Sequence, residues 1–284
     1  MVKICSKQNN MEILDYYREI QLEAAKEAYK STCHYLVIRD GNPHPHGSGV
    51  FIEINNLKFL ITAAHVVDDK EDEIYVGVDT HELVKLGGEL TKNIAVGQRD
   101  NDKIDISILK LNQKTIEKLG NKYDFIKQGE LGINHEFKSL PMYTSVGFPA
   151  SKSKYNSYKN EIKSSPFIYI TMPAEQTIYD ELQCESFSNV IVYYDKGKVK
   201  DYKTGQFFTG PDPFGISGSG LWFTPSQVKA KGAYIDKQLV AILTEWSKEN
   251  RKFWIGTRID VITEVIRQKY NLTFEKSKIV RVNL

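Results

Sequence analysis

Residues 58–67 read KFLITAAHVV, a β-branched and aromatic run that ends in two alanines and a histidine. Such a run predicts a strand, and the small residues before His65 leave room around its imidazole. Asp105 opens a second apolar strand, DISILKL. A third segment, GISGSGLW at 215–222, places Ser217 in a glycine-rich turn just before another apolar strand. Three polar groups therefore lie at predicted strand ends, in the order histidine, aspartate, serine.

Short strand-like runs continue outward from these segments along most of the chain. They are rich in β-branched and aromatic residues and are bounded by turn formers such as Asp40-Gly41 and Asn55-Asn56. The runs span 34–38, 49–54, 74–78, 104–111, 167–171, 190–194 and 239–243. They do not alternate regularly with helical patterns, which argues against a parallel α/β sheet. This pattern predicts a mainly β protein built as barrels or a sandwich.

Two helical patterns flank the strand-rich region. Between residues 11 and 31, apolar side chains recur at spacings of three or four among Glu, Lys and Arg, which predicts an amphipathic helix. These apolar residues are Ile13, Tyr17, Ile20, Ala24 and Ala28. A second helix is predicted over 260–269. The polar segment 112–136 suits a connection between two β units.

Composition and charge argue against several classes of function. The chain has 284 residues and a formal net charge of +2, with Lys and Arg scattered among Asp and Glu. Binding to nucleic acid needs a concentrated basic face, so no nucleic-acid partner is expected. No run approaches the roughly 20 apolar residues of a membrane helix, and no signal-peptide pattern is present, so no membrane partner is expected. The cysteines (Cys5, Cys33 and Cys184) are an odd, widely spaced set, which favours a reducing compartment and a cytoplasmic location.

The three polar groups at the strand ends suit nucleophilic catalysis. A serine hydroxyl such as that of Ser217 is a poor nucleophile at neutral pH until a base removes its proton. The imidazole of His65 is such a base, and the carboxylate of Asp105 is expected to fix its tautomer and stabilise the imidazolium. Gly215 and Gly218 permit positive φ angles and a close approach of substrate. The N–H groups of Gly215 and Ser217 are expected to stabilise an oxyanion together.

These segments resemble the chymotrypsin-like (trypsin-like) serine peptidases. The family's histidine motif, Thr-Ala-Ala-His, is matched letter for letter at Thr62–His65. Its Asp-Ile-Ala-Leu-Leu motif is matched conservatively at Asp105–Leu109, and its Gly-x-Ser-Gly-x turn at Gly215–Ser219. The histidine, aspartate and serine also follow the family's order. The resemblance extends over residues 33–270.

The resemblance implies a mainly all-β fold of two antiparallel β-barrels, with an N-terminal amphipathic helix and a short C-terminal helix. The expected divisions are an N-terminal helical extension (1–32), a first barrel with the histidine and aspartate (33–136), and a second barrel with the serine and the C-terminal helix (137–284). The implied activity is that of a serine endopeptidase that cleaves a protein or peptide substrate through an acyl-enzyme intermediate. No cofactor is implied.

One departure from the family concerns activation. Members that are switched on by proteolysis carry an aspartate just before the serine, which pairs with the newly cut N-terminus. Ile216 occupies that position here, and an isoleucine makes no ion pair. We therefore expect control by a regulatory protein partner or by loop ordering. Because unrestrained proteolysis inside a cell would be harmful, a narrow range of substrates is also expected.

A second departure concerns the substrate pocket, which is expected between the residues before the serine and a wall strand. Its candidate residues are Asp212, Thr244, Glu245, Trp246 and Trp254. The two acidic residues favour a basic P1 residue. The two tryptophans lie where the family usually has small residues, and they predict a shallow pocket. The sequence leaves the specificity open.

Other functions fit the sequence less well. An α/β-hydrolase needs a histidine after the serine, whereas the last histidine of the chain is His135. A catalytically silent pseudo-peptidase that acts as a protein-binding module remains an open alternative. His44 and His46 are expected in a proline-restrained loop rather than at a metal, so no metal site is predicted. The charged run Lys152–Lys163 is expected to be a solvated loop.

Overall fold

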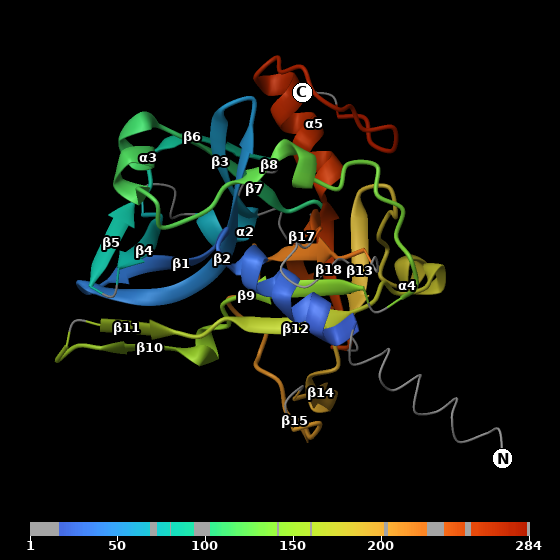
Figure 1. Cartoon of the computed structure of the whole chain (residues 1–284), viewed down its shortest axis with the longest axis horizontal. Helices are drawn as coiled ribbons and strands as arrows, with labels where there is room; N and C mark the ends of the chain where they lie inside the picture. The colour runs from blue at the N-terminus through green and yellow to red at the C-terminus, as the bar shows by residue number, and fades with distance from the viewer. Residues whose placement is uncertain are drawn as a thin grey trace.

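The computed structural model is built mainly from two curled antiparallel sheets, or half-barrels, with a helix towards each end of the chain (Figure 1). The structure describes residues 17–68, 73–79, 81–93, 103–140, 142–159, 161–201, 204–225, 236–247 and 251–282. This arrangement confirms the fold class expected from the sequence. In the described part of the chain, no helix is long and apolar enough to cross a membrane.

The first sheet has the strand order β5-β4-β1-β2-β3-β7-β6, with β8 paired in parallel to β2. Its strands are β1 (Thr32–Arg39), β2 (Asn42–Ile54), β3 (Leu57–Ala63), β4 (Tyr75–Asp79), β5 (Glu82–Lys85), β6 (Gly88–Lys92), β7 (Ile106–Leu111) and β8 (Ile126–Lys127). Alternate residues of β2 point to opposite faces, and both faces are buried. Val50 and Ile52 contact one apolar cluster, whereas Phe51 contacts another. The near-continuous apolar run in the sequence reflects this two-sided burial.

The second sheet has the strand order β12-β9-β16-β17-β18-β13. Its strands are β9 (Tyr143–Gly147), β12 (Phe167–Thr171), β13 (Asn189–Tyr193), β16 (Gly220–Phe223), β17 (Gln238–Trp246) and β18 (Phe253–Arg258). Val146, Trp222 and Ile242 from this sheet lie in the same buried cluster as Val50 and Ile52 of the first. A shared core therefore joins the two sheets, and the site described below lies where their strands end.

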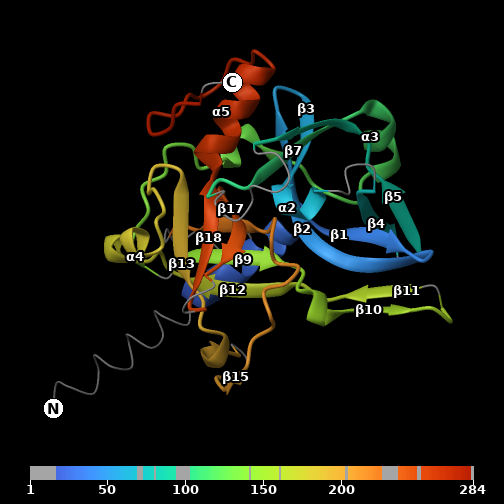
Figure 2. The ribbon, with the colours of Figure 1, turned by 180° about the vertical axis from the view of Figure 1, so that it is seen from behind.

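The helices cover the sheets from outside. Residues 17–29 are helical and bury Ala24, Ala25 and Ala28, as the apolar spacing predicts, while residues 11–16 of the expected helix lie outside the described residues. This helix lies against the β9–β12 side of the second sheet in both views (Figures 1 and 2), where Thr144 Oγ1 donates to Gln21 Oε1 at 2.8 Å. The C-terminal helix α5 (Ile259–Lys269) places apolar side chains in the shared core.

The remaining helical elements are short. They are α2 (Ala64–Val67), α3 (Gln113–Leu119), α4 (Gln176–Glu181) and the 3₁₀ turns η2 (Gln128–Glu130), η3 (Ala150–Lys152) and η4 (Lys196–Lys198). The segment 112–136, expected to connect the two β units, contains α3, β8 and η2.

Two segments expected to be loops are strands. The run Lys152–Lys163 forms most of the hairpin β10 (Ser153–Asn156) and β11 (Glu161–Ser164), which projects beside β1 and β2 (Figure 1). Its charged and polar residues give no apolar alternation that would predict strands. His44 and His46 lie in β2, whose pairing with β1 shifts register beside Pro45. A bulge of this kind accommodates proline because the ladder is already interrupted there. A further small hairpin pairs β14 (Val199–Lys200) with β15 (Phe207–Phe208).

Candidate active site

The register of the first sheet brings His65 beside Asp105. Strand β3 pairs with β7 so that Ala63 lies opposite Ile106. The residues just after β3 and just before β7 are therefore neighbours, although 40 positions separate them in the sequence. His65 lies in the single turn of α2, directly after the strand.

The contact between His65 and Asp105 is a double one. The imidazole Nδ1 lies 2.5 Å from Asp105 Oδ2, and the backbone N–H of His65 donates to Oδ1 at 3.0 Å. The N–H of Ala64 also donates to the Asp105 carbonyl oxygen, at 3.0 Å. Asp105 is 7% exposed and has a φ of 26°, a conformation that non-glycine residues rarely adopt. An ionised carboxylate in this position holds the proton on Nδ1, which leaves Nε2 as a proton acceptor.

Ser217 lies in two consecutive tight turns that precede β16. The N–H of Ile216 donates to the Pro213 carbonyl oxygen at 2.7 Å, and the N–H of Ser219 donates to the Ile216 carbonyl oxygen at 2.9 Å. The third residues of these turns are Gly215, with a φ of 91°, and Gly218, with a φ of 89°. A positive φ at this position is the signature of a type II turn and explains the glycines.

The two glycines are also required by the space around the turn. A Cβ on Gly215 would lie 2.6 Å from the Phe148 carbonyl oxygen, and one on Gly218 would lie 1.9 Å from the Ser48 carbonyl oxygen. Within the described residues, the N–H groups of Gly215 and Ser217 donate to no other group. The turn therefore offers two unused backbone donors beside the serine.

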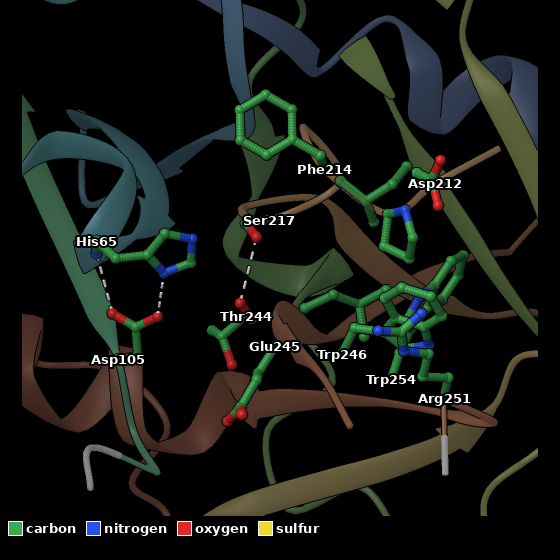
Figure 3. A pocket seen from close by; sticks show the side chains of 13 residues that line it. His65, Asp105, Asp212, Phe214, Ser217, Thr244, Glu245, Trp246, Arg251 and Trp254 are labelled. Carbon is green, nitrogen blue, oxygen red and sulfur yellow. Dashed lines mark hydrogen bonds and ion pairs between the residues drawn. The ribbon is translucent and has the colours of Figure 1, made fainter. Parts of the chain in front are cut away.

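The Ser217 hydroxyl points to its own sheet. It donates to the Thr244 carbonyl oxygen at 3.2 Å, and within the described residues no hydrogen bond joins it to His65. Thr244 is the extra residue of a bulge in β17, between Leu243 and Glu245, and a bulge redirects the backbone groups it contains. His65 and Ser217 nevertheless line the same cavity from opposite sides (Figure 3).

The cavity has a volume of about 650 Å³ and opens between the two sheets. All five residues expected at the substrate pocket line it, together with the proposed triad (Figure 3). Five further lining residues were not among these candidates, although three of them lie in the two segments expected to form the pocket: Pro213, Phe214, Ile216, Leu243 and Arg251. Phe214 is 65% exposed at the rim. The first four flank residues that were identified, whereas no sequence pattern pointed to Arg251.

The two tryptophans form one wall of the cavity. Trp246 and Trp254 pair across β17 and β18. Trp254 is 1% exposed and stacks on Tyr194 with 4.1 Å between ring centroids, while the guanidinium of Arg251 lies 5.5 Å from the Trp246 ring. Burial raises the pKa of Tyr194, so this phenol stays neutral under the wall. The bulk of the two indoles lies where a shallow pocket was expected.

The acidic candidates Asp212 and Glu245 both line the cavity. The Asp212 carboxylate forms an ion pair with Lys196 at 2.5 Å, and its side chain is 64% exposed. In Figure 3 the carboxylates of Asp212 and Glu245 both point away from the Ser217 hydroxyl. Because both residues nevertheless line the cavity, the preference at P1 stays open. The described residues contain no cluster of three or more His, Cys, Asp or Glu side chains suited to a metal.

Comparisons with known proteins support the fold. No protein-family model matches the sequence, and no curated protein matches it. Among solved structures, the chain is similar to granzyme C ("Structure of GrC"), a serine protease of the chymotrypsin fold. The match covers 87% of this chain and 96% of that one, with a TM-score of 0.51 and 11% sequence identity. At this identity the likeness shows a trypsin-like fold and leaves the activity to be argued from the site.

Proposed function

We propose that the protein is a serine endopeptidase in which His65, Asp105 and Ser217 form one catalytic unit. The observation that carries the proposal is the arrangement around one cavity. An imidazole already bonded to a buried carboxylate faces a serine whose turn presents two unused N–H groups. These are the base, the nucleophile and the electrostatic stabiliser that acyl transfer requires.

The first half of the proposed reaction forms the acyl-enzyme. Ser217 Oγ attacks the carbonyl carbon of the scissile peptide while its proton moves to His65 Nε2. The resulting oxyanion accepts hydrogen bonds from the N–H groups of Gly215 and Ser217, and Asp105 stabilises the imidazolium. The C–N bond then breaks, and His65 returns the proton to the leaving amine. Water repeats the same steps on the ester, which releases the acid product and restores the serine.

The reaction requires the Ser217 hydroxyl to turn from the Thr244 carbonyl oxygen to His65. A serine side chain changes direction by rotation about χ1 between staggered positions, at the cost of one neutral hydrogen bond, about 1 kcal/mol. Catalytic hydrogen bonds are often long or poorly aligned in free enzymes and tighten when substrate binds. The bond to Thr244 therefore describes a resting arrangement that bound substrate displaces.

The same bond favours the alternative of a catalytically silent pseudo-peptidase that binds protein. A hydroxyl held permanently by Thr244 would leave Ser217 inert. The geometry of the Asp105–His65 pair favours the enzyme, because the carboxylate makes contacts to the ring and to the backbone N–H of His65. Such a pair orients an imidazole for proton transfer.

The substrate in this proposal is a protein or peptide, handled without a cofactor and under the control of a regulatory protein partner. We further propose a cytoplasmic location and a narrow range of substrates. The bulky walls formed by Trp246 and Trp254 support a restricted side chain at P1.

Covalent labelling with a fluorophosphonate probe tests the proposal. The probe should form one adduct on Ser217 of the wild-type protein, detected by mass spectrometry of the labelled peptide, and none on the Ser217→Ala variant. A folded wild-type protein that stays unlabelled at high probe concentration would favour the silent alternative over an enzyme that is active without its regulatory partner. A peptide-library cleavage profile, with Ser217→Ala as the control, then defines the P1 residue.

A further inference from the structure

Ser48 of the first sheet makes three hydrogen bonds to residues of the second half of the chain, two of them to the serine turn and one to Phe148, just after β9. Its backbone N–H donates to the Ser217 carbonyl oxygen at 2.8 Å. Its hydroxyl donates to the Gly215 carbonyl oxygen at 2.7 Å and accepts from the Phe148 N–H at 2.9 Å. The side chain is fully buried, with 0% of the residue exposed. Both the donor and an acceptor site of the hydroxyl are therefore used at the join of the two sheets.

A neighbouring hydrogen bond fixes the direction of the Gly215 N–H. Two residues after Phe148, the N–H of Ala150 donates to the Phe214 carbonyl oxygen at 2.9 Å. In a trans peptide the carbonyl and the N–H point in opposite directions. Because the Phe214 carbonyl points towards Ala150, the N–H of Gly215 in the same peptide points away from Ala150. The Ser48 hydroxyl fixes the next peptide, between Gly215 and Ile216, so both peptides that flank Gly215 are held.

Ser48 itself has little freedom to move. Thr62 Oγ1 donates to the Ser48 carbonyl oxygen at 2.7 Å. At the preceding position, a Cβ on Gly47 would lie 2.5 Å from a methyl carbon of Val66, which follows His65 in α2. The strand segment that carries Ser48 is therefore packed against the element that carries the proposed base. This segment therefore contacts both the serine turn, which carries Ser217, and α2, which carries His65.

We propose that Ser48 is a positioning residue for the proposed reaction. Its hydroxyl links the Phe148 N–H to the Gly215 carbonyl and so holds the serine turn in the type II form that presents both N–H groups. The turn is anchored without an ion pair: the hydroxyl holds one side, and the Ile216 side chain, 3% exposed, is buried in the core of the second sheet on the other. The effect of Ser48 on catalysis rests on the proposed function. The hydrogen bonds by which Ser48 holds the serine turn do not depend on it.

Two measurements on Ser48→Ala test the proposal, with Ser145→Ala as the matched control. Ser145 is a buried serine of β9, 1% exposed, whose hydroxyl contacts Ser219 and not Gly215. The second-order rate of fluorophosphonate labelling should fall by about 10- to 100-fold in Ser48→Ala, since loss of a whole oxyanion donor costs about 10²–10³. It should change less than about twofold in Ser145→Ala. Ser48→Gly, which deletes the same hydroxyl, should also label slowly.

The second measurement needs no catalysis. Hydrogen–deuterium exchange of the peptide that contains Gly215–Ser219 should be about tenfold faster in Ser48→Ala than in Ser145→Ala, while exchange in β1 and β13 stays the same. Unchanged exchange in the turn would overturn the positioning role, as would wild-type labelling rates in both Ser48 variants. A wild-type protein that does not label would refute the proposed function but not the role of Ser48 in holding the serine turn. The hydrogen–deuterium exchange result would then decide that role.

Discussion

The first sheet delivers His65 and Asp105 already bonded to each other, whereas the second sheet delivers Ser217 with its hydroxyl bonded to its own strand β17. The acid–base pair is completed by the register of two adjacent strands, β3 and β7. The serine turn owes its shape to glycines with positive φ and to contacts from Ser48 and Ala150.

This difference identifies where the site is preorganised and where it is adjustable. The pair of the first sheet is rigid because both oxygens of Asp105 are used. The backbone of the serine turn is also held, but the hydroxyl of Ser217 has a choice of acceptors. In the proposed enzyme, the Ser217 hydroxyl must therefore leave the Thr244 carbonyl oxygen before it can bond His65.

The largest effect on kcat is expected from disrupting the His65–Asp105 pair. Asp105→Asn should lower kcat by about 10⁴-fold, because an amide that donates to Nδ1 leaves the proton on Nε2, where it blocks attack. The measurement is the cleavage rate of a peptide identified by the library profile. Asp260→Asn is the matched control, since Asp260 is a fully buried aspartate that bonds Arg258 and Ser277 instead. A small effect of Asp105→Asn on kcat would show that the pair is structural.

A smaller effect is expected from the turn that carries the serine. Gly215→Ala should slow fluorophosphonate labelling by about 10²–10³-fold, because positive φ is strained for alanine and the new Cβ meets the Phe148 carbonyl oxygen. Gly41→Ala controls for strain alone: its φ is 76°, and nothing lies within 4 Å of the added Cβ. Equal labelling rates in the two variants would refute a preorganised oxyanion site.

The smallest effect concerns stability at the join of the sheets. Burial lowers the pKa of His34 to about 4, where the ring stacks on Phe148 and its Nδ1 contacts Ser164 Oγ at 2.8 Å. Burial, with a contribution from Arg258, also lowers the pKa of His135 to about 4. Unfolded histidine binds its proton near pH 6.5, so between pH 6.5 and 4 the unfolded chain holds more protons and the fold loses stability as the pH falls.

For His34 the expected loss is about 2 kcal/mol between pH 7 and pH 5. Urea denaturation at the two pH values measures it. His34→Phe keeps an aromatic ring beside Phe148 and cannot be protonated, so its loss over this range should be smaller by that amount. A loss as large as that of the wild-type protein would show that His34 is not the group responsible.

Much of the fold was predictable because it depends on local patterns. Runs such as those at 167–171 and 190–194 are strands almost as read, since β-branched and aromatic residues favour a pleated, buried surface. The hairpin of β10 and β11 was missed because its lysines concealed the pairing of Tyr155 with Ile162. Charged residues on an exposed hairpin give no apolar alternation to detect.

The candidate site divides in the same way. The available groups could be read from the sequence, because their types and order are local: His65 after small residues, Asp105 at the start of an apolar strand, and Ser217 between glycines. The hydrogen bonds from Ser48 to the serine turn and from the Ser217 hydroxyl to Thr244 become visible only in the folded chain. Those contacts join residues distant in sequence, and their geometry is set by strand register, a bulge and shared packing, which no short motif encodes.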